Sequence, residues 1–172
     1  MKNEDVILGL LKEREYTGYE IVERIKTIFS HFFEGSYGSV YPVLHKLEKD
    51  GKVTKQTVVQ DGRPNKYVYS ITAAGVAHFQ NYLDSDVRPE AVRSDFLVRL
   101  YFGAQFSSER LRELIEEEIV RKQALLNHLE HIKQKWGAEM DTAERLCLDI
   151  GFADYRARLA VLRGALEQEQ ME

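Results

Sequence analysis

The sequence has almost no cysteine, little proline and no long apolar run, and each scarcity excludes a class of protein. Cys147 is the only cysteine among 172 residues, which excludes an intrachain disulfide framework and fits a reducing cytosol. The longest run of aliphatic residues and glycine has six residues, at 6–11, whereas a membrane span needs about 20. Charged residues flank this run on both sides, which argues against a secretory signal. We therefore expect a cytoplasmic protein without a membrane partner.

The sequence also lacks a large excess of positive or negative charge, and its net charge is −4. The charges are unevenly distributed: residues 36–72 contain six Lys or Arg and three Asp or Glu, a balance of +3, while residues 81–172 have a balance of −5. A locally basic region fits a phosphate-binding surface, although an ordinary solvated surface explains it equally well. Leu, Ile, Val and Phe account for 49 of the 172 residues, and this apolar share excludes general disorder.

Start and stop signals predict three short helices followed by a β-hairpin. Thr17 and Glu20 have the spacing of a capping box at the start of the second helix. Gly51 supplies the left-handed residue that ends the third helix, which opens near residues 35–36. Two alternating runs, 52–60 and 66–72, are joined by turn-forming residues and predict the hairpin. Thr72 then caps a fourth helix, and this order describes a winged helix-turn-helix.

The rest of the chain reads as helical. After a linker at 84–89, we expect helices at about 90–103, 108–136 and 142–168. The last helix has large apolar residues at the a and d positions of nearly three heptads: Leu148, Phe152, Tyr155, Leu159, Leu162 and Leu166. We expect these six side chains to pack partly within one chain and partly against a second subunit. The predicted fold is mainly α with a small β-hairpin: a winged helix-turn-helix DNA-binding domain at 1–86 and a helical dimerisation domain at 90–172.

The third helix and the hairpin carry the candidate DNA-binding residues. The major groove is about 12 Å wide and admits one helix, and hydroxyl and ammonium groups suit phosphate oxygens and base edges. The candidates on the helix lie away from its apolar stripe, and those on the hairpin lie at or beside its tip: Ser36, Tyr37, Ser39, Tyr41, His45, Lys46, Lys49, Arg63, Asn65 and Lys66. Winged helices also serve as protein-interaction modules, so an adaptor without DNA binding is the alternative.

An enzyme finds little support in the sequence, and we expect neither catalysis, nor a cofactor, nor a resident metal. His128 and His131 are spaced i, i+3 and could share a metal with Cys147, but no CxxC or HExxH motif accompanies them. Two histidines on a polar helix face are the simpler interpretation. Cys147 with a histidine could form a nucleophile pair, but a small core residue beside Leu146 and Leu148 is the simpler expectation.

Aromatic residues on both sides of the linker predict a possible ligand cavity between the two domains. Aromatic walls with a few hydroxyl groups suit flat, apolar ligands. The residues that we assign to this effector site are Phe33, Tyr37, Phe96 and Tyr101. A closed aromatic core is the alternative.

Four stretches of the sequence resemble PadR-type transcriptional regulators. Residues 39–51 (SVYPVLHKLEKDG) resemble their recognition helix, residues 17–21 their second-helix start, and residues 62–75 their wing. Residues 92–102 resemble the opening of the long C-terminal helical domain in the larger, AphA-like subgroup. The resemblance spans the whole chain and is most specific in the first 75 residues.

The resemblance implies a homodimer held by C-terminal helices, with two winged heads on a pseudo-palindromic operator in double-stranded DNA. It also implies control of DNA binding by a small molecule or a partner, and a repressor that a small aromatic effector releases is the expected form. By motif match, Tyr41 and Lys46 on the third helix and Arg63 and Lys66 in the wing take the DNA-facing roles.

Overall fold

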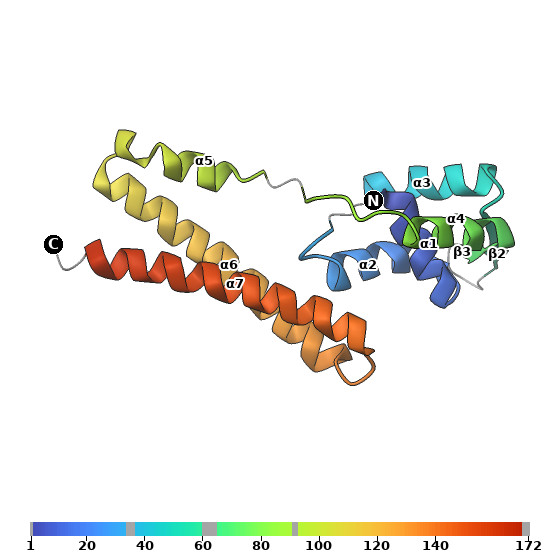
Figure 1. The fold of residues 1–172 in the computed structure, drawn as a ribbon. Helices are drawn as coiled ribbons and strands as arrows, with labels where there is room; N and C mark the ends of the chain where they lie inside the picture. The colour runs from blue at the N-terminus through green and yellow to red at the C-terminus, as the bar shows by residue number, and fades with distance from the viewer. Residues whose placement is uncertain (1, 34–36, 60–64, 91–92, 170–172) are drawn as a thin grey trace. The chain divides into compact units, whose positions relative to one another are not determined.

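The computed structural model describes residues 2–33, 37–59, 65–90 and 93–169, and the chain divides into two compact units at residues 1–90 and 91–172 (Figure 1). Most of the described chain is helical, and one small antiparallel sheet lies in the first unit. The predicted fold class is confirmed. Among the helices in these residues, none combines the length and the apolarity that crossing a membrane requires.

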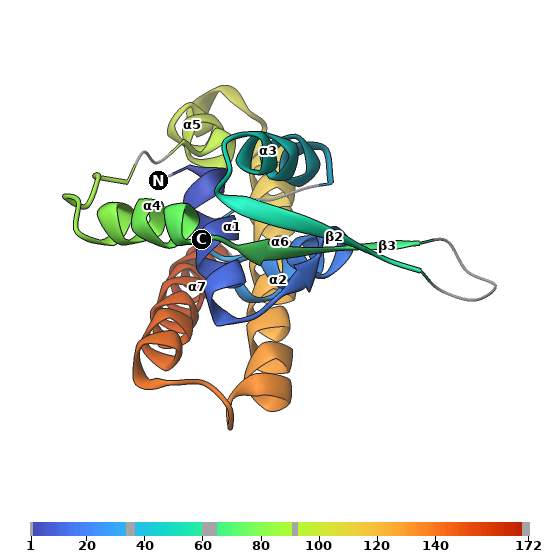
Figure 2. The ribbon, with the colours of Figure 1, turned by 90° about the vertical axis from the view of Figure 1, so that its right-hand side faces the viewer.

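The first unit is a winged helix-turn-helix. Its elements are, in order, α1 (Asn3–Glu13), β1 (Tyr16–Thr17), α2 (Gly18–Ile28), α3 (Tyr37–Lys49), β2 (Val53–Val58), β3 (Lys66–Ile71) and α4 (Ala73–Leu83). The four predicted helices and the hairpin are present, and we call β2 and β3 together the wing. The wing extends past the helices of this unit (Figure 2).

Local signals in the sequence set the ends of these helices as predicted. The Thr17 hydroxyl accepts a hydrogen bond from the Glu20 backbone N–H at 3.2 Å, and the Glu20 carboxylate accepts one from the Thr17 N–H at 2.8 Å. Thr72 caps α4 in the same way through the Gly75 N–H. Gly51 has a φ of 68° and ends α3, a conformation that glycine adopts without a steric penalty.

The sheet has a strand that sequence analysis missed. β1 pairs with β3 through Tyr16–Tyr69 and Thr17–Val68, so the strand order is β1-β3-β2. Below the sheet, one core joins the helices and all three strands, and its members include Ile7, Leu8, Ile21, Val22, Ile25, Val40, Leu44, Leu47, Val53 and Tyr69. This core fixes which face of α3 is turned inward.

The second unit is dominated by two long helices, α6 (Ser108–Trp136) and α7 (Thr142–Glu169), which pack side by side (Figure 1). Leu148, Phe152 and Leu159 of α7 form a core with side chains of α6 and with Met140. The helix expected at 90–103 is shorter: α5 covers Asp95–Tyr101 because Ser94 caps it, and a 3-10 turn (η1, Gly103–Gln105) follows.

Candidate nucleic-acid interface

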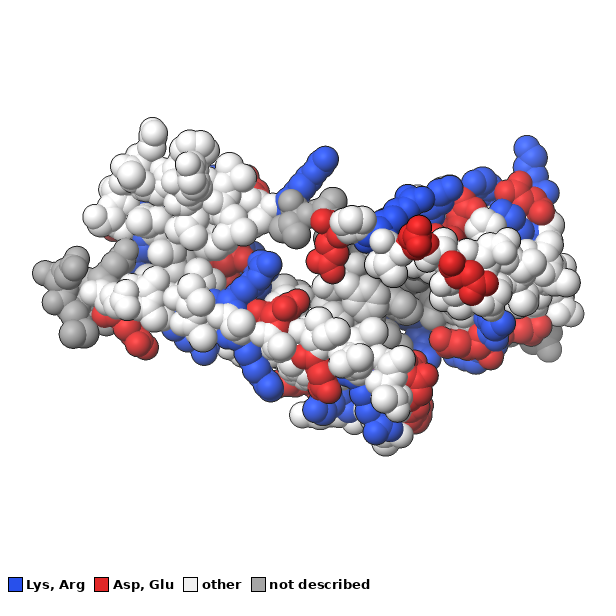
Figure 3. Space-filling view, viewed as in Figure 1, with Lys and Arg blue, Asp and Glu red and all other residues white. Residues whose placement is uncertain are grey.

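α3 is anchored to the first unit by one apolar face and presents a polar face outward. Val40, Leu44 and Leu47 are 1% exposed or less. The exposed or half-buried positions Ser39, Pro42, His45, Lys46 and Lys49 repeat every three or four residues, so they share the opposite face. Lys and Arg side chains gather over α3 in the space-filling view, with acidic groups among them (Figure 3). The helix therefore offers a polar, partly cationic ridge of the width that a DNA groove admits.

The structure places most of the predicted DNA-binding residues on two neighbouring elements. His45, Lys46 and Lys49 are exposed on α3, and Asn65 and Lys66 are exposed at the described start of the second wing strand. Ser39 is half-buried, while Tyr37 begins α3 and its side chain is not described. Ser36 and Arg63 lie outside the described residues. Whether these residues bind DNA stays a prediction.

Tyr41 lies between α3 and the start of α2. A Cβ atom at Gly18, the first residue of α2, would lie 2.8 Å from the ring carbon Cε1 of Tyr41. A side chain at position 18 would therefore require the Tyr41 ring to shift. The Tyr41 ring is still 36% exposed, so it joins the second and third helices while remaining at the surface. This contact explains why Gly18 stands at the start of α2.

Lys46 has an internal partner that sequence analysis did not foresee. Its Nζ donates a 2.6 Å hydrogen bond to Oε1 of Glu4 on α1, and Lys52 Nζ lies 3.8 Å from Oε2 of the same carboxylate. The hydrogen bond from Lys46 holds the pKa of Glu4 below its usual value, and it raises the pKa of Lys46. Glu4 and Lys46 are 42 positions apart, and no local pattern predicts such a pair.

The wing adds cationic and aromatic groups that the candidate list did not include. Lys55 on β2 places its Nζ 4.3 Å from the ring centre of Tyr67 on β3, within the range of a cation–π contact. Val53 pairs with Ile71, Lys55 with Tyr69 and Thr57 with Tyr67. The alternation of the strand predicted that Lys55 and Thr57 share a face, but the partner strand's register was needed to place Tyr67 beside them.

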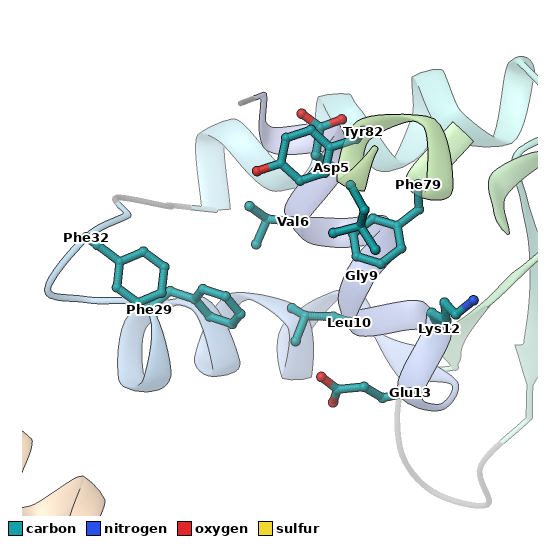
Figure 4. Close-up of a pocket in the computed structure, with 11 residues that line it drawn as sticks. Asp5, Val6, Gly9, Leu10, Lys12, Glu13, Phe29, Phe32, Phe79 and Tyr82 are labelled. Carbon is teal, nitrogen blue, oxygen red and sulfur yellow. The ribbon is translucent and has the colours of Figure 1, made fainter. Parts of the chain in front are cut away.

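A groove of about 440 Å³ opens on the first unit, and its lining residues come from α1, from the segment after α2 and from α4. Its floor is α1, and aromatic rings come from the segment after α2 (Phe29, Phe32) and from α4 (Phe79, Tyr82) (Figure 4). Charged side chains at its lining are Asp5, Lys12 and Glu13. This volume and apolar lining are typical of small-molecule sites.

The predicted effector residues are distributed over both units. Phe33 packs against the core of the first unit, and Phe96 on α5 is half-buried. Tyr101, also on α5, is 83% exposed within this unit. None of these residues lines the groove on the first unit, and the effector site stays a prediction.

The candidate metal ligands of α6 and α7 form no metal site in the described part of the chain. No group of three or more His, Cys, Asp or Glu side chains there is arranged to hold a metal ion. His128 is half-buried and His131 exposed on α6. The expectation that Cys147 is a core residue is wrong: α7 directs its neighbour Leu148 into the core, and Cys147 is exposed.

The six residues predicted for dimerisation pack mainly within their own chain. Leu148, Phe152, Leu159 and Leu162 are buried, and Tyr155 and Leu166 are half-buried. Leu148, Phe152, Leu159 and the partly buried Tyr155 belong to the core that α6 and α7 share. The heptad pattern therefore describes mainly a two-helix core, and the expectation that part of it faces a second subunit stays a prediction.

Comparison with known proteins agrees with this geometry. The description "Transcriptional regulator PadR-like family" matches residues 7–81, and "Virulence activator alpha C-term" matches residues 92–172. The PadR-like transcriptional regulator BC1756 from Bacillus cereus is 38% identical, with a TM-score of 0.91 over 99% of this chain and 100% of that one. The Negative transcriptional regulator PadR of Bacillus subtilis is 28% identical over 95% of this chain and 87% of its own length.

One similar structure contains DNA. The crystal structure of Bacillus subtilis PadR in complex with operator DNA has a TM-score of 0.83 and 25% identity, covering 96% of each chain. Both parts of this chain thus match, in the same order, parts of known transcriptional regulators. The chain belongs to the PadR-like family of DNA-binding transcriptional regulators, in the group that carries the C-terminal helical extension.

Proposed function

We propose that this chain is a homodimeric repressor that binds a pseudo-palindromic operator through α3 and the wing of each protomer. The observation that carries the proposal is the polar outer face of α3, held rigidly by the buried Val40, Leu44 and Leu47. A similar protein of known structure binds operator DNA. The repressor role is supported by the name of the Bacillus subtilis relative, a negative transcriptional regulator.

In this proposal the two elements have different tasks. α3 enters the major groove, where Ser39, His45 and Lys49 reach base edges and phosphates. Tyr41 contacts the DNA at the edge of α3 that lies next to α2. The wing follows the backbone with Lys66 and with Arg63, whose guanidinium suits phosphate oxygens.

A second copy is needed because one head reads only half of such an operator. α7 offers a surface for it: Leu146, Ile150 and Val161 are 60%, 54% and 73% exposed. Together with the exposed Ala153 and Ala157 they form a stripe on the side of α7 away from its buried residues. Small residues within an apolar stripe permit close approach of another helix. We therefore propose this stripe, rather than the Leu148–Leu166 heptad positions, as part of the dimer interface.

Release by a flat aromatic effector is the regulatory part of the proposal. It is supported by the aromatic groove on the first unit and by the predicted residues Phe33, Tyr37, Phe96 and Tyr101. A ligand changes DNA affinity only by its differential affinity for the bound and unbound conformations. Thermal shifts with planar aromatic compounds, compared between Phe79→Ala and Phe96→Ala, distinguish the groove from the predicted site. Compounds that shift neither the melting temperature nor the DNA affinity would reject effector control.

Salt-dependent DNA binding tests the core of the proposal. The dimer makes several phosphate contacts, so its affinity for duplex DNA falls steeply as salt rises. A gel-shift series with DNA from upstream of its own gene, repeated at several salt concentrations, measures this dependence. An adaptor without DNA binding predicts no salt-dependent affinity for any duplex, and that outcome would replace the proposal.

A further inference from the structure

We propose that Glu4 is a positioning residue for DNA recognition, which withholds Lys46 from DNA phosphate and so lowers the affinity of each head for DNA of arbitrary sequence. The inference rests on the proposed function, since it concerns how the α3 face meets DNA. It reassigns Lys46, which the sequence alone places among the phosphate-binding residues.

The position of Glu4 makes it an internal anion beneath a DNA-facing surface. It is the second residue of α1, and its side chain is 12% exposed. α1 packs directly against α3, so the carboxylate lies beside the helix that is to enter the groove. Lys46 projects from that helix with 57% of its side chain exposed.

The carboxylate has two cations within reach. Its Oε1 accepts the 2.6 Å hydrogen bond from Lys46 Nζ, and its Oε2 lies 3.8 Å from Lys52 Nζ. A short hydrogen bond between charged groups is roughly twice as strong as one between neutral groups. Asp50 Oδ2 lies 3.9 Å from the same Lys52 Nζ. The two lysines therefore face two carboxylates, and the charge of Lys46 is cancelled from within the protein.

The Glu4–Lys46 pair persists when DNA is present because separating the two side chains costs stability. If Lys46 moved to a phosphate, the nearly buried Glu4 would lose its short hydrogen bond and keep only Lys52, which also faces Asp50. Weakening the pairing of a mostly buried charge costs stability. Lys52 could replace Lys46 only from a longer distance. Lys46 then contributes no phosphate contact, while exposed cations such as Lys49 and Lys66 do.

A smaller number of contacts between the protein and DNA phosphates favours discrimination between DNA sequences. Phosphate contacts supply most of the sequence-independent affinity, whereas base contacts supply the preference. Removing one phosphate contact from each head weakens binding to all DNA, while the base contacts proposed for Ser39 and His45 remain. Glu4 thereby raises the share of the binding that depends on sequence.

The test is the salt dependence of binding to a labelled duplex of mixed sequence, measured by fluorescence anisotropy on the full chain. Glu4→Gln keeps the size of the side chain and an oxygen that accepts a hydrogen bond. Because the carboxylate charge is gone, the charge of Lys46 is no longer neutralised and can pair with a phosphate. We expect the slope of log K against log salt to steepen by about 0.9 per head between about 50 and 200 mM salt. Lys46→Gln leaves the slope of the wild type unchanged, and the double variant returns to that slope.

Glu130→Gln is the matched control, because it removes the same charge from an exposed position on α6, in the other unit. We expect no change in its slope, and circular-dichroism melting shows which variants fold. The proposal is overturned if Glu4→Gln binds with the wild-type slope, or if Lys46→Gln alone flattens the slope by about 0.9 per head. If Glu4→Gln does not fold, the slope of Lys46→Gln decides alone. A wild-type protein without salt-dependent binding overturns the proposed function and this inference together.

Discussion

In the first unit, side chains from α1 to α3 and from all three strands close a core around Ile7, Leu8 and Leu44, none of which is exposed. In the second unit, two helices supply nearly all of the core, and large apolar side chains remain at the surface of α5 and α7, among them Val98, Tyr101, Ile150 and Val161. Apolar side chains that are exposed on one helix face, as Leu146, Ile150 and Val161 are on α7, indicate a candidate interaction site. The comparison teaches that the two cores are built differently: several elements around α3 close the first, whereas two helices supply the second, and exposed apolar side chains occur on both units.

The largest effect is expected where the second unit closes its own core. Leu159 is 2% exposed between α7 and α6, so Leu159→Asp buries an unpaired charge. We expect a loss of about 4 kcal/mol or more of unfolding free energy, seen as the loss of the cooperative helical transition in circular-dichroism melting. A variant that melts like the wild type would show that Leu159 is not part of the core.

Two positions further along, the same substitution should affect assembly and not folding. Val161 is 73% exposed, so Val161→Asp leaves the helical content unchanged and shifts sedimentation from dimer toward the 20.0 kDa monomer. Val87→Asp is the control, because Val87 is 96% exposed in the segment that follows α4, and it should sediment like the wild type. A Val161→Asp protein that remains fully dimeric at micromolar concentration would remove the exposed stripe of α7 from the interface.

In the first unit, removal of wing cations should weaken DNA binding without destabilising the protein. Arg63→Ala with Lys66→Ala removes up to two phosphate contacts from each head, which flattens the salt slope by about 1.8 per head. Gel shifts at several salt concentrations measure the slope, and thermal melting checks the fold. Binding equal to that of the wild type would show that the wing assignment is wrong.

The smallest effect is expected at the start of α2. The Thr17 N–H donates a hydrogen bond to the carboxylate of Glu20, and this bond holds the pKa of Glu20 below its usual value of 4.5. A lowered pKa in the folded state means that the carboxylate stabilises the fold above its usual pKa and loses this effect as pH falls through the lowered value. Glu20→Gln should therefore cost about 0.5–1 kcal/mol at neutral pH, and the difference from the wild type in melting experiments should vanish in acid. A difference that is independent of pH would contradict the role of the charge.

The sequence predicted those parts of the molecule that local interactions determine. The Thr17–Glu20 box and Gly51 act over three residues or fewer, and the helix ends that they mark are correct. β1 was missed because two residues acquire strand geometry only by pairing with Val68 and Tyr69, about 50 positions away.

The candidate site was predicted less completely for the same reason. The outward face of α3 follows from its period, but the engagement of Lys46 by Glu4 depends on how α1 packs on α3. The heptad pattern of α7 was detected correctly, yet a pattern does not say whether its partner is α6 or a second subunit. Cys147 was misplaced because it adjoins Leu148 in sequence while facing another side of the helix.

The central claim is that the first unit contacts DNA and the second unit pairs two copies on one operator. The most direct test is hydroxyl-radical footprinting on a duplex selected by the protein from a random pool, with the stoichiometry of the complex measured by sedimentation. The account predicts two protomers per duplex and two protected segments related by approximate two-fold symmetry, spaced by about 10 base pairs or a multiple of that. A single protomer protecting one continuous segment, or no protection at any salt concentration, would contradict it.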